Sequence, residues 1–157
     1  MSDAIKHECG VAMLRLRKPL DYYVKKYGTA LYGLNKMYLL MEKQHNRGQD
    51  GVGLATIKVE SQPGSRYISR HRSNSNKAME DLFSYINKRF VDLQENDPEK
   101  LKNAAWLQEN IAFTGELMLG HLRYGTYGGN GIEQCHPFLR PSNWRTRSLV
   151  LAGNFNM

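Results

Sequence analysis

The stretch Gln44-His45-Asn46-Arg47-Gly48-Gln49-Asp50-Gly51-Val52-Gly53 lies between two patterns that decide the fold. Before it, apolar residues recur at helical spacing and predict a helix from about residue 29 to residue 46, with Gly48 as its stop. After it, residues 52–59 form an apolar run with the length of a buried strand. The residues that carry the helical spacing are Leu31, Leu34, Tyr38 and Met41. The stretch itself therefore indicates a helix end, a turn and the start of a strand.

Further strands and helices are expected on both sides of this unit. Residues 9–16, 117–122 and 148–152 have the alternation or the apolar run of short strands. A second helix, capped by Ser75 or Asn76, is indicated by Met79, Leu82, Phe83, Ile86, Phe90 and Leu93. The remaining segments are a short helix at 104–113, a basic loop at 61–76 that can include a strand at 66–70, a charged connector at 94–102 and a glycine-rich loop at 124–131. Strands and helices that mix without strict alternation favour the α+β class.

Composition narrows the class of protein. The chain has 157 residues and is 41% hydrophobic, which is typical of one globular domain. It contains no apolar run near the roughly 20 residues that span a bilayer, and its first residues lack the apolar stretch of a signal peptide. Cys9 and Cys135 form neither a disulfide framework nor paired zinc spacing. We therefore expect a soluble, cytoplasmic protein without a membrane partner or a structural metal.

The positive charge has two interpretations. With 22 Lys+Arg and 15 Asp+Glu, the net charge is 22 − 15 = +7, which can indicate a polyanion as partner or simply a solvated basic surface. The basic residues are spread over segments 15–18, 25–26, 66–72 and 140–147, and no nucleic-acid-binding motif organises them. We therefore expect a solvated surface and no nucleic-acid partner.

The last residues suggest a longer protein. The apolar run at 148–152 delivers the turn-type residues 153–157 to a loop, where the sequence stops. A natural C-terminus usually ends in tolerant polar sequence. We expect this chain to be the front part of something longer.

Cys9 can be read in two ways. Most free cysteines are small buried hydrophobic residues, and Cys9 begins an apolar strand. If residues 1–8 were removed, however, the same residue would carry both its thiol and a free α-amine. Such an amine titrates near pKa ~8 and can act as a base for its own side chain. Cys9 would then supply both nucleophile and base.

Two later segments can recognise charge. The strand ending at Arg123 leads into glycines and Thr126, which suits a guanidinium that binds a carboxylate, although a solvated loop arginine would look the same. Asn154 follows a strand, where its amide can donate to an oxyanion or serve ordinary turn chemistry. Cys135 has no such context, and we interpret it as structural.

The order of these motifs carries more information than any one of them. Cys9-Gly10-Val11, Arg47-Gly48-Gln49-Asp50, Gly120-His121-Leu122-Arg123-Tyr124-Gly125-Thr126 and Asn154-Phe155-Asn156 follow one another along the chain. Together they resemble class II glutamine amidotransferase domains, which belong to the N-terminal-nucleophile hydrolases. The second and third motifs are most similar to those of amidophosphoribosyltransferases. The resemblance implies an αββα sandwich of two stacked, mainly antiparallel sheets flanked by helices, truncated at its C-terminus.

The resemblance also implies roles for individual residues. Residues 1–8 would be a propeptide-like leader, and residues 9–157 the N-terminal part of the glutaminase domain. Cys9 would attack the side-chain amide of L-glutamine, while Asn154 and the backbone N–H of Phe155 would bind the oxyanion. Arg123 and Thr126 would hold the glutamine α-carboxylate, and Arg47 and Tyr124 would line the site. Relatives usually have glycine at the position of Phe155, where a side chain restricts positive φ.

The implied whole enzyme makes 5-phosphoribosylamine from phosphoribosyl pyrophosphate (PRPP) and glutamine in purine synthesis. Its phosphoribosyltransferase domain, with Mg²⁺, and the acid that binds the glutamine α-amine would lie beyond residue 157. The full-length form would be a homo-oligomer, this chain would hold no cofactor, and alone it would be inactive. Two alternatives stay open: the glutaminase domain of another class II amidotransferase, or a catalytically lapsed module that binds polyanions through residues 66–72.

Overall fold

The computed structural model describes residues 8–125, 129 and 131–155, and it confirms the α+β class. The strands and helices in chain order are β1 (Gly10–Arg15), α1 (Leu20–Tyr27), α2 (Tyr32–Glu42), β2 (Gly51–Ile57), β3 (Ile68–Ser73), α3 (Ala78–Asn96), α4 (Ala104–Asn110), β4 (Leu117–Arg123), β5 (Phe138–Arg140) and β6 (Leu149–Leu151). In the described residues, four short 3-10 helices lie between them: η1 (His45–Arg47), η2 (Pro98–Lys102), η3 (Ile132–Gln134) and η4 (Arg145–Arg147).

A four-stranded antiparallel sheet organises the chain in the order β1-β4-β2-β3. The register pairs Gly10 with Leu122 and Gly51 with Arg123, so β1 and β2 both begin where β4 ends. The candidate site residues before β1, before β2 and at the end of β4 therefore lie at one end of the sheet. We call this the Cys9 end.

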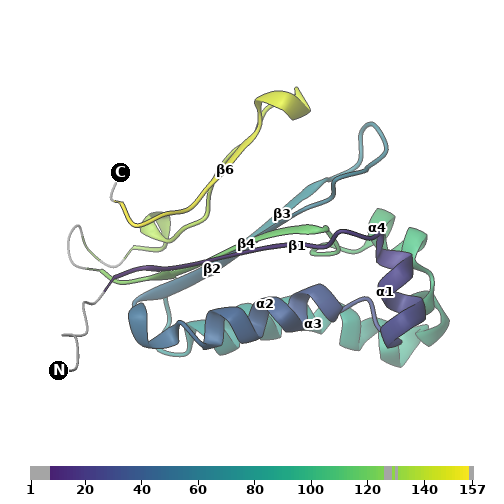
Figure 1. Ribbon diagram of the computed structural model, residues 1–157, viewed down its shortest axis with the longest axis horizontal. Helices are drawn as coiled ribbons and strands as arrows, with labels where there is room; N and C mark the ends of the chain where they lie inside the picture. Colours follow the sequence, from purple (N-terminus) through teal and green to yellow (C-terminus); the bar gives the residue numbers. More distant parts are fainter. Residues whose placement is uncertain (1–7, 126–128, 130, 156–157) are drawn as a thin grey trace.

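Helices cover one face of the sheet. Figure 1 shows α2 and α3 lying side by side beneath it, where α2 packs on β1 and β4, and α3 on β2 and β3. Strand residues alternate between the faces, so Val52, Leu54 and Leu122 meet the helices in one core. The helices contribute to that core Leu34, Met37, Met41, Leu82, Phe83, Ile86 and Phe90. Burial of these side chains is the main stabilising contribution to this layer.

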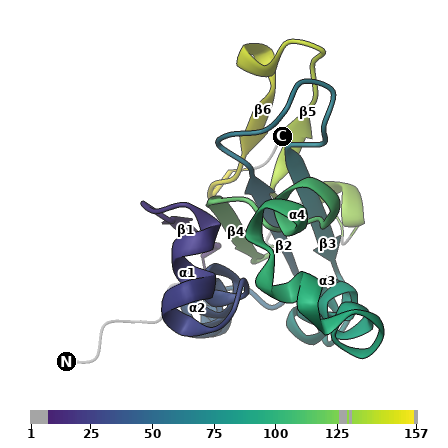
Figure 2. The ribbon, with the colours of Figure 1, turned by 90° about the vertical axis from the view of Figure 1, so that its right-hand side faces the viewer.

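The two-stranded sheet of β5 and β6 lies on the opposite side of the main sheet, as Figures 1 and 2 show. Two arginines of β3 bind the segment that leads into β5. Arg72 donates to the carbonyl oxygen of Cys135 at 2.7 Å, and Arg70 donates to that of Pro137 at 3.4 Å. Gly53 of β2 permits the close contact, because a Cβ there would overlap the His136 backbone. Above β1, by contrast, Val11 and Met13 stay 40% and 67% exposed.

The structure corrects several details of the predicted elements. The first predicted helix spans only Tyr32–Glu42, and Gly48 is not its stop: Gly48 is extended and lies so close to the end of β4 that a Cβ would meet the Leu122 carbonyl oxygen. Lys77 rather than Ser75 or Asn76 occupies the N-cap of α3, although the Ser75 hydroxyl still accepts from the Lys77 amide. Helix α1 and strand β5 were not predicted.

Across the described parts of the chain, no helix has both the length and the apolar character that a membrane crossing requires.

Candidate active site

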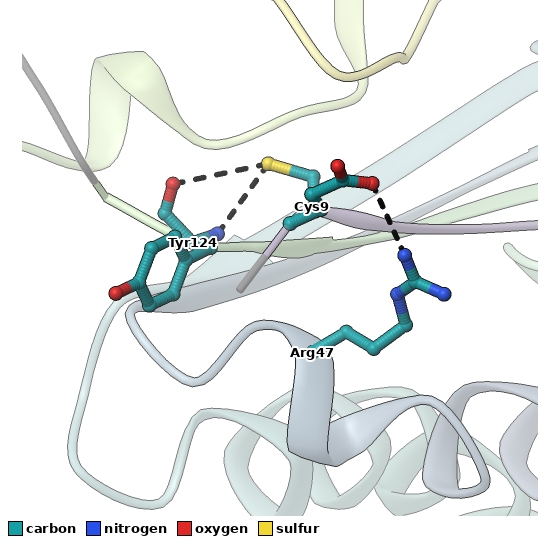
Figure 3. Close-up of polar contacts among 4 residues, drawn as sticks. Cys9, Arg47 and Tyr124 are labelled. Carbon is teal, nitrogen blue, oxygen red and sulfur yellow. Dashed lines mark hydrogen bonds and ion pairs between the residues drawn. The ribbon is translucent and has the colours of Figure 1, made fainter. Parts of the chain in front are cut away.

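Cys9 lies at the start of β1, half-buried, with its sulfur against the backbone of Tyr124. The Tyr124 N–H donates to Sγ at 3.4 Å, and the Tyr124 carbonyl oxygen is 3.9 Å from the same atom (Figure 3). The contact follows from the pairing of β1 with β4, which places the residue before Gly10 beside the residues after Leu122. The backbone of Tyr124 thus orients the thiol.

Arg47 comes to the same place from η1, on the other side of the Cys9 backbone. Its Nη2 lies 3.2 Å from a carboxylate oxygen of Glu8 (Figure 3). Both side chains are about half exposed, so the pair contributes little to stability. Its consequence is positional, since the guanidinium stands next to the residue that carries the thiol.

Arg123 is the last residue of β4 and is 4% exposed. Its Nη2 donates to the Gly129 carbonyl oxygen at 2.8 Å and to the Gln134 side-chain oxygen at 2.9 Å. Its Nη1 is also buried but has no hydrogen-bond partner within the described residues. An unsatisfied donor on a buried cation is costly, and an anion that supplied the acceptor would relieve the cost.

Asp50 ties the turn before β2 to the end of β4. Its N–H donates to the Arg123 carbonyl oxygen at 3.0 Å, and its carboxylate accepts from the Gly125 N–H at 2.7 Å. These two bonds hold both sides of Tyr124, and therefore the amide that contacts Cys9. Asp50 stands in the motif that the sequence singled out, but no role could be assigned to it before its partners were known.

A pair of histidines lies close enough to Arg123 to be affected by its charge. His121 of β4 and His136 have ring centroids 4.3 Å apart, and both are buried. Desolvation is the main cause that lowers both pKa values, to about 4 for His121, and the charge of Arg123 lowers each further. Both rings contact the backbone of Gly153, the residue before Asn154.

The remaining predicted residues fall into two groups. Asn154 and Phe155 follow β6 and are exposed, and the Phe155 ring lies 4.9 Å from that of His136. The only non-glycine residue with positive φ in the described chain is Phe113, so Phe155 does not adopt the conformation that a side chain would strain. Thr126 lies outside the described residues.

The sequence analysis missed three contributors to this end of the molecule: His121, His136 and Gln134. His121 and Gln134 do stand near Arg123 in the sequence, but only the fold shows what they contact. Cys135 is fully buried beside Gly51, and burial raises the pKa of its thiol, as expected of a structural cysteine. Among the residues that the structure describes, no group of three or more His, Cys, Asp or Glu could hold a metal ion.

Comparison with family models, with curated proteins and with solved structures finds no match to this chain.

Proposed function

We propose that the chain is the front part of a glutamine-hydrolysing domain of the class II amidotransferase type, with Cys9 as its nucleophile. One observation carries this proposal: Cys9 and the buried Arg123 lie at the same end of the sheet, and the backbone N–H of Tyr124, the residue after Arg123, donates to the Cys9 sulfur. The Arg123 guanidinium keeps a donor without a partner in the described residues. A carboxylate on Arg123 would bring an amino-acid substrate next to the sulfur, since a bidentate guanidinium suits such a group. The finer expectation of an αββα sandwich belongs to the same proposal.

The particular enzyme that we propose is an amidophosphoribosyltransferase. This choice rests on the residues of two motifs, Arg47-Gly48-Gln49-Asp50 and Arg123-Tyr124, which resemble those of that family more than those of the other class II amidotransferases. Phosphoribosyl transfer, PRPP and Mg²⁺ would belong to a second domain, for which residues 9–157 would release the ammonia.

The reaction would need removal of residues 1–8. The new α-amine takes the proton of the Cys9 thiol, and the sulfur attacks the side-chain amide carbon of glutamine. The tetrahedral oxyanion is held by Asn154 and a backbone N–H. It collapses with cleavage of the C–N bond, and ammonia leaves with the proton from the α-ammonium group. Water then hydrolyses the glutamyl thioester, giving glutamate and the free thiol.

Removal of the leader would also change Arg47. Its present partner is Glu8, which would leave with the leader. The guanidinium would then stand beside a new amino terminus without a paired carboxylate, where it can meet the substrate.

Intact mass and active-site labelling test the proposal on the protein expressed from its complete coding sequence. We expect the active enzyme to begin at Cys9, to release ammonia from glutamine, and to be alkylated on Cys9 by an electrophilic glutamine analogue. Cys135 is a matched control, because it is a second free thiol that is fully buried. An enzyme that hydrolyses glutamine with residues 1–8 retained, or with Cys9→Ala in place, would refute the mechanism.

The alternative of a polyanion-binding module gains no support from the arginines on which it depends. Arg70 and Arg72 donate to backbone carbonyls of the segment before β5, and Arg66 to the Ile68 carbonyl oxygen. Salt-dependent binding to nucleic acid that persists in Cys9→Ala would favour that alternative.

A further inference from the structure

Two imidazoles hold the peptide groups on both sides of Gly153. The Nε2 atom of His121 lies 3.1 Å from the Gly153 carbonyl oxygen, and the Gly153 N–H donates to Nδ1 of His136 at 3.2 Å. His121 belongs to β4, and His136 to the segment that β3 fastens through Arg72. A residue near the end of the described chain is thus bonded to two separate parts of the fold.

These contacts assign the proton on each ring. A carbonyl oxygen can only accept, so Nε2 of His121 must carry the hydrogen; an amide N–H can only donate, so Nδ1 of His136 must be bare. The bare Nδ1 makes His136 neutral, and the burial that lowers the pKa of His121 favours the neutral form of that ring as well. The arrangement also leaves Nδ1 of His121 as a buried lone pair without a partner in the described structure.

His136 also contacts the residue on the far side of Asn154. The Phe155 ring lies 4.9 Å from the His136 ring and folds back over Gly153, where a Cβ would overlap it. Both neighbours of Asn154 are consequently held, Gly153 by two hydrogen bonds and Phe155 by ring contact.

We propose that His121 and His136 are positioning residues, which hold Asn154 and the Phe155 N–H toward the oxyanion by clamping Gly153. The inference rests on the proposed glutaminase function and deepens it. An oxyanion donor has to be in place before charge develops, because its value lies in being preorganised. The two histidines act through Asn154 and the Phe155 N–H and are not proposed to touch a reacting atom.

Reciprocal amide substitutions test the clamp. The side-chain oxygen of Asn can take the place of a histidine Nδ1, and the side-chain nitrogen of Gln that of Nε2. His136→Asn and His121→Gln should therefore keep their bonds to Gly153, whereas His136→Gln and His121→Asn should lose them. In the full-length enzyme we expect the second pair to lower kcat for glutamine about 100-fold at nearly unchanged KM, and the first pair to stay within a few fold of wild type.

A double substitution separates positioning from general damage. If the histidines work through Asn154 and the Phe155 N–H, His136→Gln should lower kcat by a smaller factor in an Asn154→Ala background than in the wild type. Additive losses, a loss expressed in KM, or equal losses in all four single variants would overturn the inference. Thermal unfolding of each variant identifies those that fail to fold. Nitrogen-15 NMR of the wild-type protein tests the clamp without any of these variants.

Nitrogen-15 NMR of the wild-type protein tests the clamp without glutamine. We expect neutral rings protonated at Nε2 for both histidines, and slow hydrogen exchange at the Gly153 amide. Opposite tautomers or a rapidly exchanging amide would refute the clamp even if the enzyme hydrolyses glutamine. A confirmed clamp in a protein that releases no ammonia would instead refute the proposed function, and with it the role of the histidines in catalysis.

Discussion

Buried charged side chains at the two ends of the main sheet differ in whether their hydrogen-bonding groups have partners. At the end opposite Cys9, Lys58 donates to the Gln108 carbonyl oxygen, and Glu116 accepts from the Val59 N–H at 3.0 Å and from Gln108. Arg145 closes this cluster by donating to two backbone carbonyls. At the Cys9 end, Arg123 is just as buried but keeps an unpaired donor within the described residues.

Cavity size by itself favours the end opposite Cys9. A cavity of about 590 Å³ lies at the end opposite Cys9, lined in part by Lys58, Glu60, Gln62, Gln108 and Arg145. Its cations bond to the chain itself, and burial lowers the pKa of Lys58. Buried charge that is satisfied by the chain stabilises the fold, whereas the donor of Arg123 that lacks a partner in the described residues is what supports the proposed ligand at the Cys9 end.

Replacing one arginine at each end of the sheet should distinguish the two ends most clearly. Because Arg123 is proposed to bind the glutamine carboxylate in a desolvated site, Arg123→Gln should lower kcat/KM about 1000-fold, mainly through KM. Arg145→Gln, the matched change at the opposite end, should leave kcat/KM within about twofold, since its partners are backbone carbonyls far from Cys9. Steady-state ammonia release measures both. Equal losses in the two variants would contradict the assignment of the site.

Glu116→Ala should have the largest effect on stability. It leaves the Val59 N–H and Gln108 without their acceptor and Lys58 without its neighbouring carboxylate, so the free energy of unfolding should fall by about 3–4 kcal/mol. Urea unfolding gives the value. Glu99→Ala is a suitable control, because its ion pair with Lys102 is exposed. A small loss at Glu116 would mean that this cluster does not stabilise the fold.

Acid should destabilise the Cys9 end through His121. Its pKa is about 4 in the folded chain, mainly through desolvation and then through His136 and Arg123, whereas a free histidine titrates near 6.5. The unfolded chain binds more protons between these values, so stability is complete above about pH 6.5 and is lost as the pH falls toward 4, by at most about 3 kcal/mol. Denaturant unfolding at several pH values measures this slope. His121→Gln should flatten it, and an unchanged slope would contradict this account.

The smallest effect is expected at Glu8. Its ion pair with Arg47 is half exposed, so Glu8→Gln should change the free energy of unfolding of the unprocessed chain by less than about 0.5 kcal/mol. In the processed enzyme the residue would be absent, and kinetics should not differ. Thermal unfolding before processing and ammonia release after it test the two statements separately.

Local patterns predicted much of the fold. The spacing of apolar residues in α3 and the apolar runs of β2 and β4 were sufficient to predict these three elements. A helix or strand that buries a face or its whole length leaves that pattern of apolar residues in the sequence. Helix α1 was missed although Leu20, Tyr23 and Val24 are buried at helical spacing, because its 8 residues offer little more than two turns of pattern. Strand β5 has 3 residues, too few for any alternation to be read.

For the candidate site, the sequence alone indicates which groups can do chemistry and in what order they occur: a thiol, a guanidinium and a carboxamide near strand ends. Which contacts these groups make follows from the tertiary structure. The antiparallel register sets Cys9 against the Tyr124 amide, and the packing of the 133–137 segment on β3 brings His136 to Gly153. Such contacts join residues 17 to 115 positions apart, and no local spacing encodes them, because they depend on how strands pair and layers pack.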